Sequence, residues 1–466
     1  MKPIPIFGEG VRSYSDVVTR QRRLNCLYDI RKDGDRTAVI VVGTPGSYVW
    51  TTIPSSPIYG WCVAGNLLYV VASTSLYSVS PGGVYTLLGT LPTVSSKVSM
   101  DTNSVDVLIV DGVTGYVYNI ASGTLTTVTD VNFPAGTISI AELNSRYYAV
   151  RPNSREFDAS QLLDGTTWSP QVFGTKENTS DELLQVLNFS GVLALFGARS
   201  IEFWQDTGAS PLPVTRITGA TQQWGLAAIR SISRVGNTLM FLGLDPDGGV
   251  RVVKLQGYTP IPVSTSDINE IINKMTVISD ATAITYNSFG HSLYQITFPS
   301  EDRSFLFDNS TGMWQETQTG LDVQTRHFAD LGISFARRNV VTDTSSGNLY
   351  FLDDEHFTDN GTSIKREVCT RHIYADGNEQ FLAQFMLAME VGVSNGSSIM
   401  LEVSRDGGKT FGPQKIKSLG ALGDYLRPIV FNRLGRARDF VLRISMTDQT
   451  RFIITNASAT LEVANG

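Results

Sequence analysis

The feature that most constrains this chain is a pair of short β-strands that recurs along most of its length. In the first clear copy, a turn at Gly65-Asn66 precedes an apolar strand at 67–72, and a second strand with aromatic and β-branched residues follows at 76–79. Later copies have their turns at residues 103, 144, 190, 236 and 290, and a looser last copy ends at 348–352. A hairpin of this kind cannot bury its apolar face alone, whereas copies stacked in a ring can.

The spacing of these copies indicates the architecture. Successive turns lie 38, 41, 46, 46 and 54 residues apart, close to the length of a four-stranded propeller blade. The 42 glycines and the short strands favour an all-β fold. Few windows have the apolar period of a helix, the best being 267–275 and 181–187. We therefore predict a β-propeller over residues 45–360 with about six blades, five or seven being possible. A stack of β-sandwiches is the alternative.

Size and cysteine content limit the class of protein. At 466 residues, the chain is expected to form two or three domains. Its longest apolar run, 67–72, is too short to span a bilayer, and its start has no apolar segment of signal-peptide length. Cys26, Cys62 and Cys369 are too far apart in sequence to predict a disulfide framework or a structural zinc site. These features predict folding in a reducing cytoplasm.

Charge is distributed unevenly along the chain. Residues 37–364 carry 16 basic and 29 acidic residues, a balance of −13, whereas residues 1–36 and 365–466 each have a balance of +3. An acidic body repels nucleic-acid phosphates. This distribution fits either ordinary solubility or a body that must lie near DNA without gripping it.

Both ends of the chain carry arginines suited to protein contacts. Residues 1–44 are expected to form an arm, irregular over its first 36 residues, that docks on the platform through apolar anchors between 24 and 30. Residues 361–466 alternate as strands of a β-sandwich, and we predict that this sandwich and the arm together form a platform. Guanidinium groups pair bidentately with carboxylates and phosphates. We therefore predict an assembly interface that contains Arg20, Arg22, Arg23, Arg427, Arg433, Arg436 and Arg438. A solvated arginine-rich loop is the alternative.

The sequence predicts no catalytic, cofactor-binding or metal-binding residues. Its four histidines lack metal-ligand spacing, and the Asp-Asp-Glu-His stretch at 353–356 is interpreted as an exposed turn. Residues 404–411 match the S-x-D-x-G-x-T-[FW] "Asp-box" hairpin of sialidase propellers, but this match occurs once and outside the predicted propeller. Hydrolase and nucleotide-binding motifs are absent. A carbohydrate-binding or sialidase-like propeller protein is the alternative function.

Two stretches resemble a known family. Residues 183–209 read LLQVLNFSGVLALFGARSIEFWQDTGA, and residues 404–438 run from SRDGG to RLGRAR. Both are similar to the packaged-DNA stabilisation protein, also called the tail hub or nozzle, of short-tailed bacteriophages. Residues 23–28 followed by 43–46 are similar to that family's opening. The likeness extends over nearly the whole chain, with the segments in the same order.

The resemblance implies a structural virion protein and not an enzyme. In this family, a homo-hexameric ring extends the DNA channel below the portal and the head-to-tail adaptor protein, retains the packaged genome and carries tailspikes or tail fibres. Some relatives also hold a tail needle or plug. Genomic DNA would pass through the lumen without sequence-specific contact, and the host envelope would be reached only through other tail proteins. The expected location is the virion tail, assembled in the bacterial host cytoplasm, and no cofactor is implied.

Overall fold

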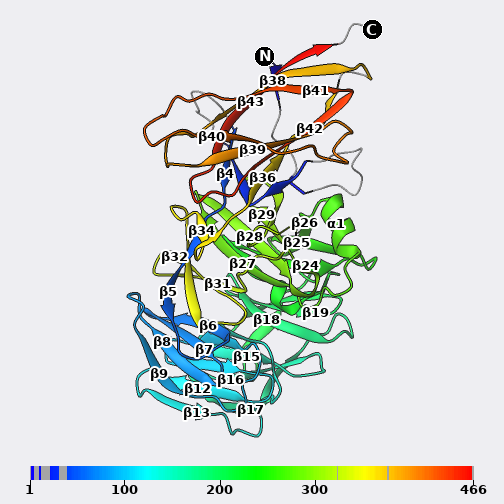
Figure 1. Cartoon of the computed structure of the whole chain (residues 1–466). Coiled ribbons are helices and arrows are strands. Elements are labelled where there is room, and N and C mark those ends of the chain that lie inside the picture. The colour runs from blue at the N-terminus through cyan, green and yellow to red at the C-terminus, as the bar shows by residue number, and fades with distance from the viewer. Residues whose placement is uncertain are drawn as a thin grey trace.

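The computed structural model describes residues 2–4, 10, 11, 21–30, 39–322, 324–374 and 377–463. These residues form two stacked modules, a large β-propeller and a smaller β-sandwich, and the first and last described strands both lie in the sandwich (Figure 1). The prediction of an all-β propeller with a β-sandwich platform is confirmed. In the part of the chain that is described, no helix is both long enough and apolar enough to cross a bilayer.

The described part of the propeller contains seven antiparallel sheets, which we call blades 1 to 7 in chain order. Blade 1 comprises β6 (Ile58–Ala64), β7 (Leu67–Ala72), β8 (Ser75–Val79) and β9 (Tyr85–Thr90). Blade 2 comprises β10 (Ser99–Thr102), β11 (Asp106–Val110), β12 (Gly115–Asn119) and β13 (Thr124–Thr127). Blade 3 comprises β14 (Ile140–Leu143), β15 (Arg146–Val150), β16 (Glu156–Gln161) and β17 (Asp164–Thr175). Blade 4 comprises β18 (Leu183–Phe189), β19 (Val192–Gly197), β20 (Ile201–Asp206) and β21 (Val214–Arg216). Blade 5 comprises β22 (Gly225–Leu226), β23 (Ser233–Val235), β24 (Thr238–Leu244), β25 (Val250–Gln256) and β26 (Thr259–Pro262). Blade 6 comprises β27 (Thr282–Ser288), β28 (His291–Phe298), β29 (Arg303–Asp308) and β30 (Met313–Thr317). Blade 7 comprises β31 (Leu331–Phe335), β32 (Arg338–Thr342), β33 (Asn348–Asp353) and β5 (Gly46–Thr52).

The seventh blade closes the ring with a strand from the other end of the propeller. Strand β5 precedes blade 1 in the chain, yet it pairs antiparallel with β33, so that Ser47 lies opposite Leu352. The short strands β34 (Thr358–Asp359) and β35 (Thr362–Ser363) extend this sheet beyond β5. The ring therefore has seven blades over the described residues, the largest number left open by the sequence and one more than the favoured number of six. In sequence, only three strands of blade 7 follow blade 6. The last copy of the hairpin repeat therefore looked incomplete.

Neighbouring blades share buried apolar clusters. Blades 7 and 1 are joined by Leu68, Val70, Leu349 and Phe351, among others. Among the described residues, six further clusters join each of the other neighbouring pairs around the ring. Each hairpin thus buries its apolar faces against the preceding and following blades. This is the packing that a recurrent unit without a core of its own requires.

One of the two expected helices is present and the other is a strand. Helix α1 (Ser266–Asn273) begins where the Thr265 side chain accepts a hydrogen bond from the Ile268 N–H, as its sequence predicted. The helix expected at 181–187 is wrong, because Leu183–Phe189 is the first strand of blade 4. Burial in this strand recurs at every third residue, and a register shift against β19 lies between Leu183 and Gln185. This spacing imitates the apolar period of a helix. Two short 3-10 helices, η1 (Ile229–Ser231) and η2 (Pro299–Glu301), complete the described helical segments.

The sandwich is built from both ends of the chain. Its first sheet comprises β1 (Lys2–Pro3), β3 (Cys26–Ile30), β4 (Val39–Gly43), β43 (Ile453–Val463), β38 (Gln380–Met389) and β41 (Ile429–Ala437). Its second sheet comprises β36 (Arg366–Cys369), β37 (Ile373–Tyr374), β42 (Asp439–Met446), β39 (Ser398–Ser404) and β40 (Lys415–Ser418). A buried core that includes Tyr28, Phe385, Leu401 and Phe440 fills the space between the sheets. The segment that looked irregular in sequence thus supplies two full strands of the sandwich.

Strand β2 (Arg23–Leu24) joins the two modules. It pairs parallel with β30 of blade 6 and antiparallel with β36 of the sandwich. Blade 6 and the second sandwich sheet are therefore one continuous sheet of hydrogen-bonded strands.

The closing interface between blades 7 and 1 gives a test of the ring. We predict that Leu349→Ala lowers the free energy of unfolding by about 2–5 kcal/mol, since it empties a fully buried site in the closing cluster. Urea denaturation followed by tryptophan fluorescence measures the change. The control is Leu87→Ala on the outer strand of blade 1, where the side chain is 57% exposed and the change should stay within about 0.5 kcal/mol. Equal effects of the two substitutions would contradict the closed ring.

Candidate functional site

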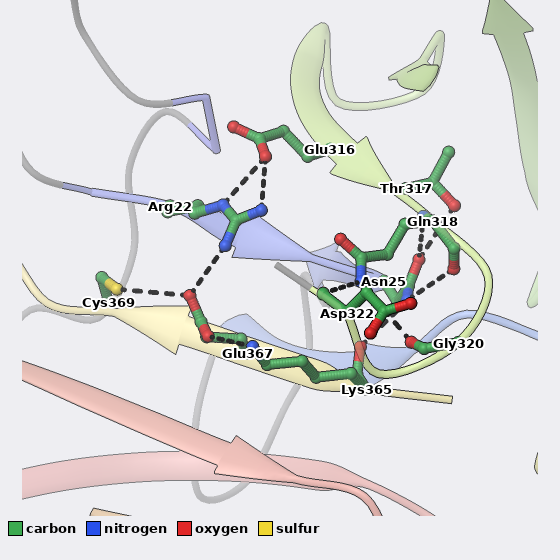
Figure 2. Close-up of polar contacts among 10 residues, drawn as sticks. All are labelled: Arg22, Asn25, Glu316, Thr317, Gln318, Gly320, Asp322, Lys365, Glu367 and Cys369. Carbon is green, nitrogen blue, oxygen red and sulfur yellow. Dashed lines mark hydrogen bonds and ion pairs between the residues drawn. The ribbon is translucent and has the colours of Figure 1, made fainter. Parts of the chain in front are cut away.

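Arg22 forms an ionic contact at the junction of propeller and sandwich. Figure 2 shows its guanidinium between Glu316 of blade 6 and Glu367 of the sandwich strand β36. Its Nε and Nη2 lie 2.8 and 2.7 Å from Glu316 Oε2, and its Nη1 lies 3.1 Å from Glu367 Oε1. Burial alone would lower the pKa of Arg22, but the two carboxylates raise it above its ordinary value. A single guanidinium therefore ties the two modules together.

Asn25 adds a second tie between the same three segments (Figure 2). Its Nδ2 donates to the carbonyls of Gln318 and Lys365 at 3.0 and 2.9 Å. Its Oδ1 accepts from the Thr317 hydroxyl and the Gln318 N–H, both at 2.9 Å. The amide thus uses its full capacity of two donated and two accepted bonds. The backbone of Asn25 has φ 52°, a left-handed conformation that asparagine adopts more readily than most residues.

The predicted N-terminal interface residues contact their own chain where they are described. Arg23 is almost fully buried; its Cζ lies 3.5 Å from the Tyr28 ring centroid, and its Nη2 donates to the Trp314 carbonyl at 3.0 Å. Arg22 pairs as described above, and Arg20 lies outside the described residues. Arg22 and Arg23 thus hold the arm against its own modules, and a contact of this arm with another subunit stays a prediction.

The stretch at 353–356 is a turn, as predicted, and it touches the sandwich. Glu355 Oε2 lies 2.6 Å from Arg451 Nη2, and Asp354 accepts from the Ser288 hydroxyl and the Phe289 N–H. Over the residues that the structure describes, no group of three or more His, Cys, Asp or Glu side chains could hold a metal ion. The carboxylates of this turn have protein donors as partners.

Removal of the Arg22 guanidinium tests the junction. Arg22→Met leaves the Glu316 carboxylate without its cation and leaves Glu367 with Lys365 alone, and we expect a loss of about 3 kcal/mol in the free energy of unfolding. Urea denaturation with a probe in each module measures this loss and shows whether the modules still unfold together. Arg251→Met is the control, because Arg251 is 45% exposed and pairs with Asp245 away from the junction. A loss no larger than that of the control would refute the role of Arg22.

The four predicted C-terminal arginines lie on the surface of the sandwich. Arg427, Arg433, Arg436 and Arg438 are all exposed, and they belong to a segment, 405–438, with eight basic and two acidic residues. This segment includes β40 and β41, edge strands of the two sandwich sheets, which contact each other. Arg433 has φ 55°, a conformation rare enough for arginine to indicate a local constraint.

Exposed apolar side chains accompany these cations, and the sequence analysis did not predict them. Ile416 and Leu422 are 61% and 64% exposed, and Tyr425 and Leu426 are 65% and 91% exposed. The only sequence signal is the glycine-punctuated stretch Leu-Gly-Ala-Leu-Gly-Asp-Tyr-Leu, whose apolar residues do not alternate. Single exposed apolar residues are common, but a group of them within one loop and its adjoining strand indicates an interaction surface. We call these residues together the basic–apolar edge: Arg405, Lys409, Lys415, Ile416, Lys417, Leu422, Tyr425, Leu426, Arg427, Arg433, Arg436 and Arg438.

The Asp-box is a local hairpin between β39 and β40. The Asp406 carboxylate accepts hydrogen bonds from the Thr410 N–H and hydroxyl and from the Ser404 hydroxyl, the last at 2.7 Å. The Ser404 hydroxyl in turn accepts from the Gly408 N–H. These bonds, first of all those from Thr410, lower the pKa of Asp406 far below its ordinary value. The motif therefore organises a turn at the basic–apolar edge.

The shifted pKa of Asp406 predicts a pH-dependent effect. A carboxyl whose pKa is lowered by folding contributes stability above its unfolded pKa of about 3.9, and this contribution is lost as pH falls through the folded pKa. Asp406→Asn should therefore lower the Tm at pH 6, and the difference from wild type should shrink as pH falls below about 4. Thermal unfolding from pH 2 to 7 measures the difference. Asp424→Asn, at an exposed ion pair with Arg427, is the control. A difference that is constant with pH would contradict the prediction.

A cavity of about 630 Å³ lies where the seven blades converge on the propeller axis. Its walls include Tyr59 of blade 1, Ser99 of blade 2, Gln185 of blade 4 and Thr282 of blade 6. This volume equals that of about 20 water molecules. It cannot hold a passing double helix, whose major groove alone is about 12 Å wide. The cavity on the axis of a single propeller is therefore too small for a double helix to occupy.

Two family descriptions match this sequence. Residues 44–357 match "Bacteriophage P22 Gp10, beta-propeller", and residues 365–462 match "Bacteriophage P22 Gp10, beta-sandwich". The boundary between the matched segments lies in the connection from the propeller to β36. Comparison with curated proteins gave no match.

Solved structures with similar folds have low identity to this chain. The extracellular domain of a hybrid two component system from B. thetaiotaomicron is 7% identical, with a TM-score of 0.45, and the alignment covers 78% of this chain and 43% of that one. The Pan2 WD40 domain of Neurospora crassa is 8% identical, with a TM-score of 0.43 and coverage of 69% and 97%. A chain of the mitotic checkpoint complex is 13% identical, with a TM-score of 0.45 and coverage of 70% and 95%. At TM-scores below 0.5, these likenesses add nothing to the assignment of fold or function.

Proposed function

Because the chain belongs to the bacteriophage P22 Gp10 family and is therefore a phage structural protein of the virion tail, we propose that it is the tail hub, or nozzle. In this proposal, six copies form a ring that extends the DNA channel below the portal and the head-to-tail adaptor. The ring retains the packaged genome and carries tailspikes or tail fibres. The observation that carries the proposal is the family match across both modules, from residue 44 to residue 462.

The small axial cavity supports a channel formed between subunits. A cavity of about 630 Å³ leaves no room for a duplex inside one propeller, so the conduit must be enclosed by several copies. Homo-oligomers favour closed symmetry, and a head-to-tail contact that closes on itself produces a ring. The channel wall is then an outer face of each chain, which an excess of acidic residues in the propeller would make non-adhesive to DNA.

The basic–apolar edge is our candidate for the contact between subunits. Its surplus of exposed cations complements the propeller segment 37–364, which has a balance of −13. Electrostatic complementarity of this kind orients partners and speeds their encounter. Its exposed Tyr425 and Leu426 supply the apolar contact area that charges alone do not provide.

The remaining parts of the proposal concern partners and location. The adaptor protein would bind on the side of the ring that faces the head, and a needle or plug could close the far end. The host envelope would be reached only through other tail proteins. Assembly would take place in the cytoplasm of the bacterial host, and the protein would act without enzymatic activity.

Charge reversal at the edge tests the assembly role. The triple variant Arg433→Glu, Arg436→Glu and Arg438→Glu should fold, because all three side chains are exposed, but it should remain a monomer in light scattering and fail to form rings on purified head–adaptor particles. Circular dichroism checks the fold. The matched control reverses three exposed propeller arginines, Arg155, Arg199 and Arg251, and should still assemble. Rings formed normally by the first variant would show that the interface lies elsewhere.

A further inference from the structure

The axial cavity contains a group of cations that the tail-hub proposal does not use. Lys97, Arg230 and Arg326 line it together with Asp330. They come from the loop before β10, from η1 and from the loop before β31, which are far apart in sequence. In blade 5, η1 interrupts the inner edge of the sheet between β22 and β23, and this interruption places Arg230 at the cavity.

The carboxylate of Asp330 is already used by one of these cations. Lys97 Nζ donates to Asp330 Oδ1, and both side chains are largely buried, with 20% and 6% exposure. Burial lowers the pKa of Lys97 while Asp330 raises it, and the nearby Arg230 and Arg326 lower it further. Asp330 thus forms an ion pair with Lys97, and the guanidinium groups of Arg230 and Arg326 lie near this pair.

Those two guanidinium groups retain unused donors. Within the described part of the chain, the Arg230 side chain makes one hydrogen bond, from Nη2 to the Lys97 carbonyl at 3.0 Å. Among the described residues, the half-buried Arg326 guanidinium forms no ion pair or hydrogen bond. A guanidinium carries five N–H donors in a planar fork, so most donors of the exposed Arg230 and the half-buried Arg326 are free to meet a ligand in the cavity that both residues line.

Two other carboxylates line the cavity, and both have donors of their own. Asp111 accepts from the Thr93 hydroxyl and from the N–H groups of Val113 and Thr114. Asp280 accepts from the Ser300 N–H through one oxygen, while its other oxygen has no hydrogen-bond partner among the residues that the structure describes. The acidic surface of the propeller lies outside the cavity, and at physiological salt its charges are screened over about 8 Å. Among the lining residues, Lys97, Arg230 and Arg326 are balanced by Asp111, Asp280 and Asp330, so attraction of an anion depends on the unused donors of the two arginines and not on a net charge of the cavity.

We propose that the axial cavity of the propeller binds a small oxyanion, a phosphate or a carboxylate, between Arg230 and Arg326. A cavity of about 630 Å³ lies within the range of about 300–1,000 Å³ that small-molecule sites occupy. A guanidinium group can pair with a phosphate or carboxylate through two parallel hydrogen bonds, each about twice as strong as a hydrogen bond between neutral groups. Bound there, the anion links blade 5 to the loop that precedes blade 7.

The test measures anion binding by the isolated, full-length chain. Titration calorimetry in 150 mM NaCl with inorganic phosphate in one arm and malonate in the other should give saturable binding of at least one anion with a stoichiometry of one, and the two arms distinguish a phosphate site from a carboxylate site. Arg230→Gln and Arg326→Gln should each weaken this binding about tenfold, the value of one charge-assisted contact. The double variant should abolish it. Arg251→Gln, an exposed arginine of blade 5 paired with Asp245 outside the cavity, should bind as wild type does.

Two results would overturn the proposal. One is the absence of saturable binding of either anion to the wild-type chain. The other is binding that the double variant retains in full, which would place the anion elsewhere on the surface. Circular dichroism and the Tm of each variant establish that the propeller is folded. Because the assay uses the chain without assembly partners, its outcome is independent of whether the protein forms the tail hub.

Discussion

The pairing of β5 with β33 is the interaction on which the rest of the structure depends. Every blade buries one apolar face against the blade before it and one against the blade after it, so an open ring would leave two such faces in water. Strand β5 removes this cost by completing blade 7 with residues that precede blade 1. The cluster of Leu68, Val70, Leu349 and Phe351 can then form between the first and last blades.

The same N-terminal segment also joins the propeller to the sandwich. Between residues 21 and 52, the chain supplies β2 to the continuous sheet, β3 and β4 to the sandwich and β5 to the ring. Arg22 and Asn25 lie where these roles meet, and their polar groups contact blade 6 on one side and the strand or loop next to β36 on the other. Loosening this segment would therefore affect ring closure and module contact together.

The molecule separates its surface chemistry by module. Cations and exposed apolar side chains gather on the edge of the sandwich formed by β40 and β41, whereas the propeller carries the excess of carboxylates. The axial cavity is an exception inside the acidic module, since Arg230 and Arg326 present unused donors there. A ring of such chains can use one module for cohesion and the other for a surface to which DNA does not adhere, as we propose for the tail hub.

Local pattern was sufficient for the elements whose partners are adjacent in sequence. The recurrent hairpins, helix α1 and the Asp-box turn follow from spacing and turn residues, because their hydrogen bonds are made within a few tens of residues. The C-terminal strands followed from their alternation, although partners such as Gln380 and Val463 lie much farther apart in sequence. The strand at Leu183–Phe189 is the instructive failure, since its buried residues recur at every third position as they would in a helix. The exposed side chains of the basic–apolar edge were likewise hidden, because apolar letters do not reveal which side faces water.

Sequence alone therefore determined that this chain is a propeller followed by a sandwich, and that its charge divides between them. The tertiary structure decided the number of blades, the roles of Arg22 and Arg23 and the existence of the axial cavity. Each of these depends on contacts between residues about 130 to 345 positions apart, such as Arg22 with Glu367 or Arg230 with the Lys97 carbonyl. No local pattern encodes such contacts, because they exist only once the ring has closed and brought the distant segments together.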